Sequence, residues 1–484
     1  MKDSSISPSL RLRRLLGHFF SNNDNICLVT TQSRSLLTKS CYLTDLSTLP
    51  DSVALVEKWL PLAPAQMALF NDRSLSGTLL ASLTLVYRLP QDSVIATPIY
   101  LCQRHYFVPR GLFAEDSGQN LVIPPTPIAD RAKPLDGVIT AIAHHPLAFT
   151  ELKQNLAAYV QTLIIRAQRF ISLCETLALR IDEGLVREYF REESRVVEEA
   201  LSHLPEGRTS IQFAPVAKQQ ICLEVEFARG QLKLDFTGTS NSPFAVTAQQ
   251  TFAASLGTLN RLLLGREMLI AGLSQHLAVV APKNTFVNGG ELANPLNWIE
   301  GTSWVAHATA QAMSQYSPQF QAAQHGLTNC PVLLHRPDGE SQLLISPVGM
   351  GGSSVYRGRN AVYIWNDPGH HALPIHNDPS ADCLSLASYH LRRNSGGKGR
   401  LGGGNGLVQS YKVTQPCRIE WFYTDERAKG SEGGKAGSAA EVQIKKAGQT
   451  WETLPSQGDT QLVTGDELAI LSPGGGGFGV PPNT

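Results

Sequence analysis

The residues whose type and spacing most clearly suggest a binding function are glycines near the end of the chain. Four of them, Gly474 to Gly477, follow one another in "ILSPGGGGFGVPPNT", and other glycine-rich stretches precede them from about residue 340. Glycine adopts positive φ without cost and lets two backbones approach closely, because it has no Cβ. Free amides in such a turn can bind a substrate anion or face a neighbouring subunit. A disordered tail and a plain hairpin end are the alternatives.

One glycine-rich stretch matches a nucleotide-binding pattern by its letters. Gly397, Gly399 and Gly402 fit G-x-G-x-x-G, which binds a dinucleotide when a strand precedes it and a helix follows. The residues that follow here, "NGLVQSYKV", are typical of a strand, so we do not expect a dinucleotide cofactor. The sequence also contains no GxxxxGK[ST] phosphate-binding loop.

Histidines and carboxylates gather in one further stretch. "NDPGHHALPIHND" holds three histidines and two aspartates: His370, His371, His376, Asp367 and Asp378. Imidazole and carboxylate suit a divalent metal, but the stretch has two prolines and no fixed ligand spacing such as HExxH. A polar surface loop is therefore the favoured interpretation, with a metal site as the alternative.

The cysteines exclude several other classes of site. Eight of them are spread from Cys27 to Cys417 without a CxxC or CxxH cluster, which excludes zinc-finger and thioredoxin-like centres. Their scatter fits reduced thiols, so we expect a cytoplasmic protein. There is also no GxSxG nucleophile elbow.

Charge and hydropathy narrow the class of partner. Lys and Arg together number 41, as do Asp and Glu, so the formal net charge is zero. A nucleic-acid-binding protein normally shows a basic excess, which is absent here. A chain without net charge does not repel other subunits, so association is plausible. No run of 18 apolar residues exists, and we expect no membrane-spanning helix.

The elements that must position these residues change in type along the chain. In 1–130, "NICLVTT" and "TLLASLTLVYRL" are typical of strands, and the proline-rich "VIPPTPIADRAKP" (122–134) indicates a boundary. A long helix is expected next, because eight residues share one stripe: Leu152, Leu156, Val160, Leu163, Ala167, Phe170, Cys174 and Leu177. A second helix over about 183–204 would complete a helical hairpin.

The rest of the chain predicts a mixture of strands and helices. From 208 the pattern alternates with period two, and "ARGQ" marks the turn of a β-hairpin. Helices are expected around 246–265 and 300–316, and strands such as "LAILS" separate the glycine loops after 340. We therefore predict an α+β fold with four regions: 1–130, a helical hairpin at 135–207, a central α+β region at 208–340, and a β-rich glycine-loop region at 341–484.

Three motifs in order resemble one protein family. "LDFTGTS" (234–240), "RRNSGGKGRLGGGNG" (392–406) and "SPGGGGFGVPP" (472–482) are similar to the DF-x-GTS, SGG-x-G and closing PGGGG-x-G elements of the hydantoinase B type. This type includes the B-like part of 5-oxoprolinase and the large subunits of acetone carboxylases. The resemblance implies that the terminal glycines form a packed loop of this fold.

The same resemblance implies a partner and a reaction. Such proteins work with a hydantoinase A-type ATPase subunit in a hetero-oligomer, and ATP bound by that partner phosphorylates the carbonyl oxygen of a small cyclic amide such as 5-oxoproline or a hydantoin. The B-type chain then supports attack on the activated carbon. A divalent metal can add Lewis-acid polarisation there.

This chain departs from the family pattern where the metal is expected. Asp24 stands three residues before Cys27, and "FNDRSLSGTLLAS" keeps Asn71, Asp72, Gly77 and Thr78. The expected histidine position is Leu79 and the expected aspartate position is Ser82, neither of which suits a metal. His105 and Asp116 are the nearby substitutes, outside the pattern.

The expected site follows from these matches. We expect Asp24 and Asp72 to be catalytic, and the substrate to contact five further residues: Asn71, Gly77, Thr78, Gly475 and Gly476. No metal ligand set is expected. Two hypotheses stay open: a hydrolase subunit with a different or metal-free site, and a degenerate structural or regulatory subunit that keeps the fold and the partner interface.

Overall fold

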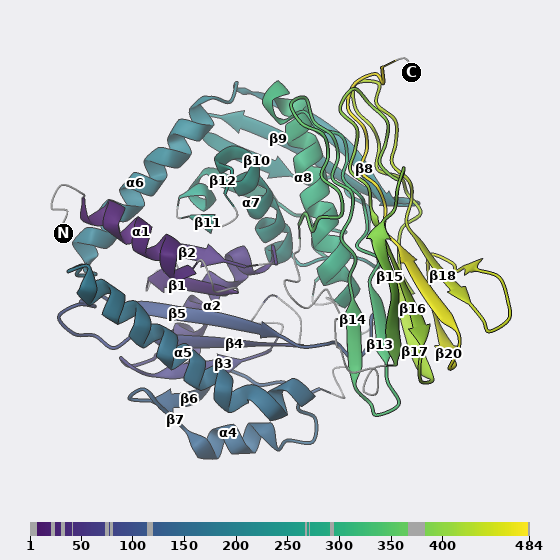
Figure 1. Ribbon diagram of the computed structural model, residues 1–484. Coiled ribbons are helices and arrows are strands. Elements are labelled where there is room, and N and C mark those ends of the chain that lie inside the picture. Colours follow the sequence, from purple (N-terminus) through teal and green to yellow (C-terminus); the bar gives the residue numbers. More distant parts are fainter. Residues whose placement is uncertain are drawn as a thin grey trace.

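The computed structural model describes residues 7–20, 25–30, 34–40, 42–72, 77, 81–113, 120–266, 269–270, 272–290, 295–365 and 383–482. Helices and four sheets occur among these residues, which confirms the α+β class (Figure 1). No helix in these ranges is long and apolar enough to cross a membrane.

The first sheet is antiparallel and has the strand order β11-β2-β1-β5-β4-β3-β6-β7. Its strands are β1 (Ile26–Thr30), β2 (Ser35–Lys39), β3 (Met67–Phe70), β4 (Ser82–Arg88), β5 (Ile99–Tyr106), β6 (Thr126–Asp130), β7 (Lys133–Pro134) and β11 (Leu269–Ile270). Ile26 and Leu28 enter the core shared with α5 (Thr150–Thr176), while Cys27 and Val29 pack with α2 (Asp45–Trp59). Both faces are covered, so the central strands β1, β3 and β4 are buried on both sides.

Two features of this sheet differ from the sequence analysis. The proline-rich stretch at 122–134 contains β6 and β7. The short edge strand β7 pairs only with Ala129 and Asp130, so β6 is open on one side at Pro127, where proline is tolerated. At the opposite edge, β11 comes from residues far beyond 130 and pairs with β2. The sheet therefore joins parts of the chain that the predicted regions separate.

The two predicted helices are present as α5 and α6 (Glu183–Ser202), and seven of the eight residues of the predicted stripe are buried; Leu177 is exposed. The sequence analysis did not predict α1 (Pro8–Phe20), which packs against α6 and contacts α5. The ring of Phe19 meets that of Phe170 in α5, and Arg13 donates to Glu193 in α6 at 2.7 Å. The helix α4 (Asp136–Ala143) precedes α5.

The central region combines a four-stranded sheet with two helices. The strands are β8 (Gly207–Val216), β9 (Gln219–Ala228), β10 (Gln231–Asp235) and β12 (Leu277–Val280), which runs parallel to β10. The predicted hairpin is confirmed: Arg229 and Gly230 both have positive φ, as its two-residue turn requires. The predicted helices are α7 (Ala248–Leu264) and α8 (Thr302–Tyr316), which pack together. Short helical turns cover Leu273–His276, Asn297–Gly301 and Pro318–Phe320.

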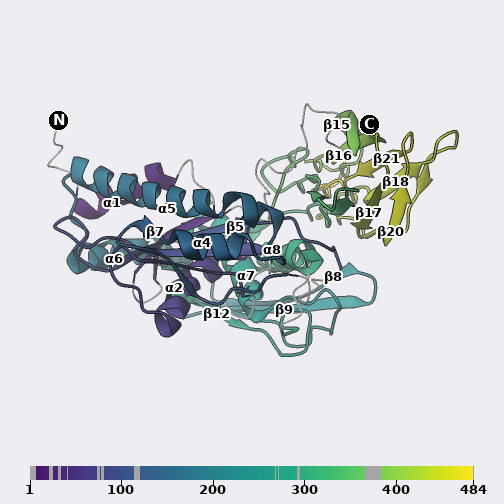
Figure 2. The same cartoon turned by 90° about the horizontal axis from the view of Figure 1, so that it is seen from below.

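The C-terminal region contains two packed sheets beside the rest of the molecule (Figure 2). One holds β13 (Val332–His335), β14 (Ser341–Leu344), β17 (Cys417–Phe422) and β20 (Gln457–Leu462). The other holds β15 (Leu384–Leu391), β16 (Leu407–Val413), β18 (Glu441–Lys445), β19 (Glu452–Thr453) and β21 (Glu467–Leu471). Side chains of both sheets share one core, including Ile419 and Ile470.

Extended glycine-rich segments adjoin these sheets and lie side by side (Figure 1). We call the segments 349–358, 396–406, 430–437 and 474–479 the glycine bundle. Each segment hydrogen-bonds through its backbone to at least two of the others; Gly475, for example, donates to the carbonyl of Gly404 and accepts from the amide of Gly397. The glycines therefore form a packed loop structure, as the family resemblance implied.

Candidate functional site

The sequence-predicted residues of the N-terminal region lie around the ends of β3 and β4. Asn71 is fully buried, its amide nitrogen donates to the Leu121 carbonyl at 2.9 Å, and its oxygen accepts from the Ile123 amide at 2.6 Å. Asp72 follows it and is half-buried. Asn71 thus holds the neighbouring backbone, which presents Asp72 at the end of the strand.

Gly77 lies where two helices approach. Its φ is +64°, and a Cβ there would stand 3.0 Å from the Gln249 Oε1 atom of α7 and 3.1 Å from the Thr48 Cγ2 atom of α2. Three more predicted positions, Asp24, Thr78 and Leu79, lie outside the described residues. The structure thus brings Gly77 to the same end of the sheet as α2.

A buried ion pair occupies this end of the sheet. The carboxylate of Asp45 accepts from Arg104 Nη1 at 2.5 Å, from the Tyr106 hydroxyl at 2.6 Å and from the Ser40 hydroxyl at 2.8 Å. Arg104 also donates to Thr48 at 2.8 Å. Burial acts to lower the pKa of Arg104, but Asp45 and Tyr106 together outweigh it and raise the pKa above its ordinary value. The guanidinium is a permanent buried cation.

Aromatic rings close over this ion pair. Tyr42, Tyr106 and Trp298 are mutually in contact, with ring centroids 4.4 to 4.7 Å apart. The indole of Trp298 donates to the Thr44 hydroxyl at 3.0 Å. The rings exclude water on one side, which strengthens the electrostatic interaction between Asp45 and Arg104.

The described residues do not fit the metal that the family resemblance implies. Ser82, at the expected aspartate position, is buried in β4 opposite Tyr106. His105 is stacked 3.8 Å from the ring of Tyr159, and burial lowers its pKa to about 3. No group of three His, Cys, Asp or Glu side chains in the described ranges could hold a metal ion. Asp116 and the histidine-rich stretch 367–378 lie outside those ranges.

The terminal glycines do not present free amides, which corrects one prediction. The amides of Gly474 to Gly477 each donate to a backbone carbonyl, at distances between 2.8 and 3.2 Å. None of the four has positive φ; their small size is needed instead, because a Cβ at any of them would overlap a backbone carbonyl group. Gly475 lies against Met350, which lines a cavity described next. A role of Gly475 and Gly476 in shaping the substrate site stays a prediction.

A cavity of about 670 Å³ opens between β2, α7, α8 and the glycine bundle. Its described lining contains three basic side chains, Lys39, Arg261 and Arg359, and no carboxylate. Ser40, also in its wall, donates to Asp45, so the cavity adjoins the buried ion pair. This cavity and the Asp45–Arg104 pair together form the candidate site. The sequence analysis missed it, because its walls come from segments that are distant in sequence.

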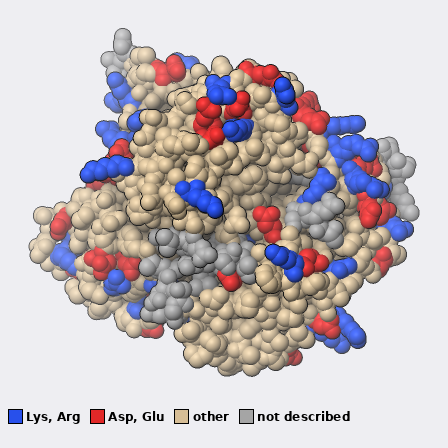
Figure 3. Space-filling view, turned by 180° about the vertical axis from the view of Figure 1, so that it is seen from behind, with Lys and Arg blue, Asp and Glu red and all other residues tan. Residues whose placement is uncertain are grey.

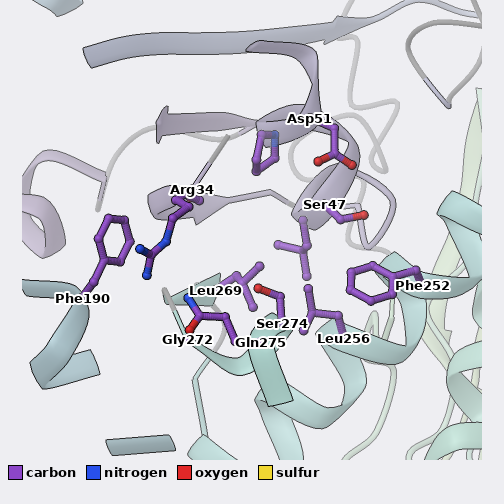
Figure 4. Close-up of a pocket in the computed structure, with 13 residues that line it drawn as sticks. Arg34, Ser47, Asp51, Phe190, Phe252, Leu256, Leu269, Gly272, Ser274 and Gln275 are labelled. Carbon is purple, nitrogen blue, oxygen red and sulfur yellow. The ribbon is translucent and has the colours of Figure 1, made fainter. Parts of the chain in front are cut away.

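A smaller cavity of about 280 Å³ lies among β2, α2, α6 and α7 (Figure 4). The guanidinium carbon of Arg34 lies 4.0 Å from the ring centroid of Phe190. Burial lowers the pKa of Arg34. Leu46, Leu256 and Leu269 are among the other lining residues. The size falls just below that of ordinary ligand pockets, so we assign it to packing between the sheet and the helices.

One buried acid was also missed by the sequence analysis. Glu300 lies on the π-helical turn Asn297–Gly301, and desolvation raises its pKa to about 8. One carboxyl oxygen accepts from the Asn329 amide at 2.8 Å, and the other has no hydrogen-bond partner among the described residues. Such turns often mark functional positions. A lone acid within the apolar run "NWIEGTSWVAHA" was the available signal.

The sequence is similar to a described protein family and to several known proteins. A family model described as Hydantoinase B/oxoprolinase matches residues 114–481. An uncharacterised protein of Methanocaldococcus jannaschii is 24% identical over 85% of this chain and 75% of its own. The B-type chain of a putative D-/L-hydantoinase from a Pseudomonas species is 24% identical over 68% of this chain, which spans 60% of that relative.

Solved structures share the fold over nearly the whole chain. The ATP-dependent caprolactamase from Pseudomonas jessenii superposes with a TM-score of 0.82 at 15% identity, covering 99% of this chain and 92% of that one. Nucleotide-free acetone carboxylase gives a TM-score of 0.74 at 14% identity, covering 98% and 73%. Since the family model covers well over half of the residues, this chain belongs to the hydantoinase B/oxoprolinase family.

Proposed function

We propose that this chain is the B-type component of an ATP-dependent enzyme that opens a small cyclic amide. The observation that carries the proposal is the match of 99% of the chain to the caprolactamase fold, together with the family model. The sequence has no phosphate-binding loop of its own, so we assign ATP to an A-type ATPase partner. The cytoplasm is the proposed location.

The candidate site supplies the features that this chemistry needs. An amide carbonyl is a poor electrophile, and phosphorylation of its oxygen by the partner would activate the carbon. The basic cavity would hold the resulting anion, and Ser40 connects its wall to the Asp45 carboxylate. A fixed buried cation, Arg104, orients that carboxylate without a metal. Asp24 and Asp72 remain the proposed catalytic acids, with Asn71, Gly77, Thr78, Gly475 and Gly476 around the substrate.

A second candidate function has its own support. The expected histidine and aspartate positions are Leu79 and Ser82, neither of which suits a metal, and this favours a structural or regulatory subunit that keeps the partner interface but not the chemistry. Figure 3 shows acidic and basic side chains interspersed over one face. The formal net charge is zero, and a chain without net charge does not repel other subunits, which fits a role in an assembly.

Co-purification with an A-type ATPase separates the two functions. The complex is assayed for ADP release and ring opening with 5-oxoproline, hydantoin and caprolactam, and its metal content is measured. The enzyme proposal expects ATP-dependent opening of at least one ring. A stable complex that opens none of them, with or without added zinc, manganese or iron, supports the structural role.

Asp24→Ala provides a residue-level check on the same complex. If Asp24 is catalytic, turnover disappears while the melting temperature stays near that of the wild type. Loss of stability together with activity would show that Asp24 is structural.

A further inference from the structure

We propose that the exposed surface of the glycine bundle is a docking surface for the A-type ATPase, which meets it with acidic side chains. This inference rests on the proposed function, which assigns ATP to that partner. Figure 1 shows the bundle at the edge of the molecule, beside the C-terminus, where another chain can reach it. The charge, the exposed apolar side chains and the position of this surface each point to a protein partner.

The side chains that the bundle carries are not needed for its own packing. At most of its glycines a Cβ would overlap backbone atoms, so the segments pack through their backbones. The four segments contain four basic residues, Arg357, Lys398, Arg400 and Lys435, and one acidic residue, Glu432. Because the whole chain has equal numbers of acidic and basic residues, the bundle is a local excess of positive charge.

Three of these cations lie on paired backbone segments. Lys398, Arg400 and Lys435 are all exposed. The amide of Lys435 donates to the Lys398 carbonyl at 2.7 Å, and the amide of Arg400 donates to the Gly479 carbonyl at 3.1 Å. Every ion pair between described residues uses other basic side chains. An acidic surface on a partner would therefore be attracted to these three side chains.

Exposed apolar side chains lie beside the cations. Val480 follows Gly479, the backbone partner of Arg400, and is 71% exposed. Val355 is 78% exposed, and these two valines are the most exposed large hydrophobic residues in the described part of the chain. The neighbouring Tyr356 is 46% exposed. Arginine, tyrosine and apolar side chains together are typical of a protein interface.

The position of this surface favours the ATPase as its occupant. Val355 and Tyr356 line the 670 Å³ cavity, and the amide of Gly358, in the same segment, donates to the Gly402 carbonyl at 2.9 Å. Gly402 lies two residues after Arg400, so one hydrogen-bonded bundle carries both the cations and part of the cavity wall. A partner docked on the bundle would lie beside the candidate site, where an enzyme that activates the substrate is needed.

Biolayer interferometry with the full chain and the A-type ATPase tests the inference. The Kd should weaken as NaCl rises from about 0.05 M to about 0.5 M, because salt screens exposed charges. The double variant Lys398→Glu/Arg400→Glu should weaken the Kd at low salt at least about tenfold, mainly through slower association. The matched control is Lys153→Glu/Arg169→Glu on α5, which reverses the same number of exposed charges and should stay within about twofold of the wild type.

Val480→Ser tests the apolar part of the surface separately. It should weaken the Kd at least about fivefold, because buried apolar area is lost from the interface. Its control is Val463→Ser, at a valine that is 53% exposed in the turn between β20 and β21, where no change is expected. All these side chains are exposed, so the melting temperatures should stay near that of the wild type.

Four results would overturn the inference. They are a Lys398→Glu/Arg400→Glu variant within about twofold of the wild type, equal weakening by both double variants, a Kd that salt does not change, and an unaltered Kd for Val480→Ser. Loss of binding to phosphatidylserine vesicles in the Lys398→Glu/Arg400→Glu variant, with its ATPase binding intact, would assign the surface to a membrane instead. Each of these results, with ring opening intact in the wild-type complex, leaves the proposed function standing, whereas the absence of any complex with the ATPase contradicts both.

Discussion

Glu300 illustrates how strongly burial alters the pKa of a single carboxyl group. It lies at 0% exposure, one carboxyl oxygen holds the Asn329 amide, and no cation among its described neighbours compensates its charge. Desolvation therefore raises its pKa from 4.5 to about 8. The folded protein carries this carboxyl in protonated form at neutral pH.

Glu300→Gln should flatten the pH dependence of stability. The folded state keeps a proton that the unfolded state releases above pH 4.5, so this stabilisation is complete below that pH and is lost as pH rises through about 8. Between pH 5 and pH 9 the free energy of unfolding should fall by roughly 4 kcal/mol more in the wild type than in Glu300→Gln, at about 1.36 kcal/mol per pKa unit. Urea denaturation at both pH values measures the difference.

The control for Glu300 is an exposed acid. Glu452→Gln on β19 should leave the wild-type pH profile unchanged. A Glu300→Gln profile as steep as that of the wild type would mean that Glu300 is ionised in the folded protein.

Arg104→Met should destabilise the protein strongly. It leaves the Asp45 carboxylate buried without its cation, and breaking one side of such a pair typically costs about 3 to 5 kcal/mol. Arg208→Met is the control, because Arg208 pairs with Glu224 and Glu226 on the surface, and its melting temperature should not change measurably. Equal melting temperatures for the two variants would show that Asp45 takes up a proton at little cost.

The elements show which interactions a sequence can reveal. The stripe of α5, the Arg229–Gly230 turn and the strand β16 follow from local period and turn chemistry, and the structure confirms them. In α1, the apolar residues Leu12, Leu15, Leu16, Phe19 and Phe20 have a similar helical spacing and are all buried. The sequence analysis did not predict this helix, in which arginines alternate with the apolar residues. The Asp45–Arg104 pair had no local signal, because its members are separated by 59 positions and meet only in the folded sheet.

The glycine bundle depends on close backbone packing, and a substitution can test this directly. At Gly476 a Cβ would overlap the Lys429 carbonyl, so Gly476→Val should lower stability by more than about 1 kcal/mol, the usual cost of overpacking. Gly402→Ala is the matched control within the bundle, because its Cβ would meet only the Gly397 oxygen at 3.6 Å. Thermal unfolding compares them, and a neutral Gly476→Val would mean that this segment is free to move.

At the scale of the molecule, the regions are joined by contacts that are remote in sequence. The amide of Leu112 donates to Glu420 of the C-terminal sheets at 2.8 Å, and β11 completes the first sheet. The candidate cavity is one result, since β2, α7, α8 and the bundle each contribute to it. A sequence pattern identifies such segments one by one, while their meeting depends on the tertiary fold.

Deletion of residues 472–484 should therefore disrupt much more than the end of the chain. The segment 474–479 donates to the carbonyls of Gln324, Gly404 and Lys435, and accepts from the amides of Gly352 and Gly397. At roughly 1 kcal/mol for each lost hydrogen bond, several kcal/mol of stability should disappear, with faster proteolysis of the bundle. Deletion of 481–484 keeps these bonds and should match the full chain. If the longer deletion melts at the same temperature, the bundle is held by its other segments alone, and the terminal glycines have no part in supporting the cavity.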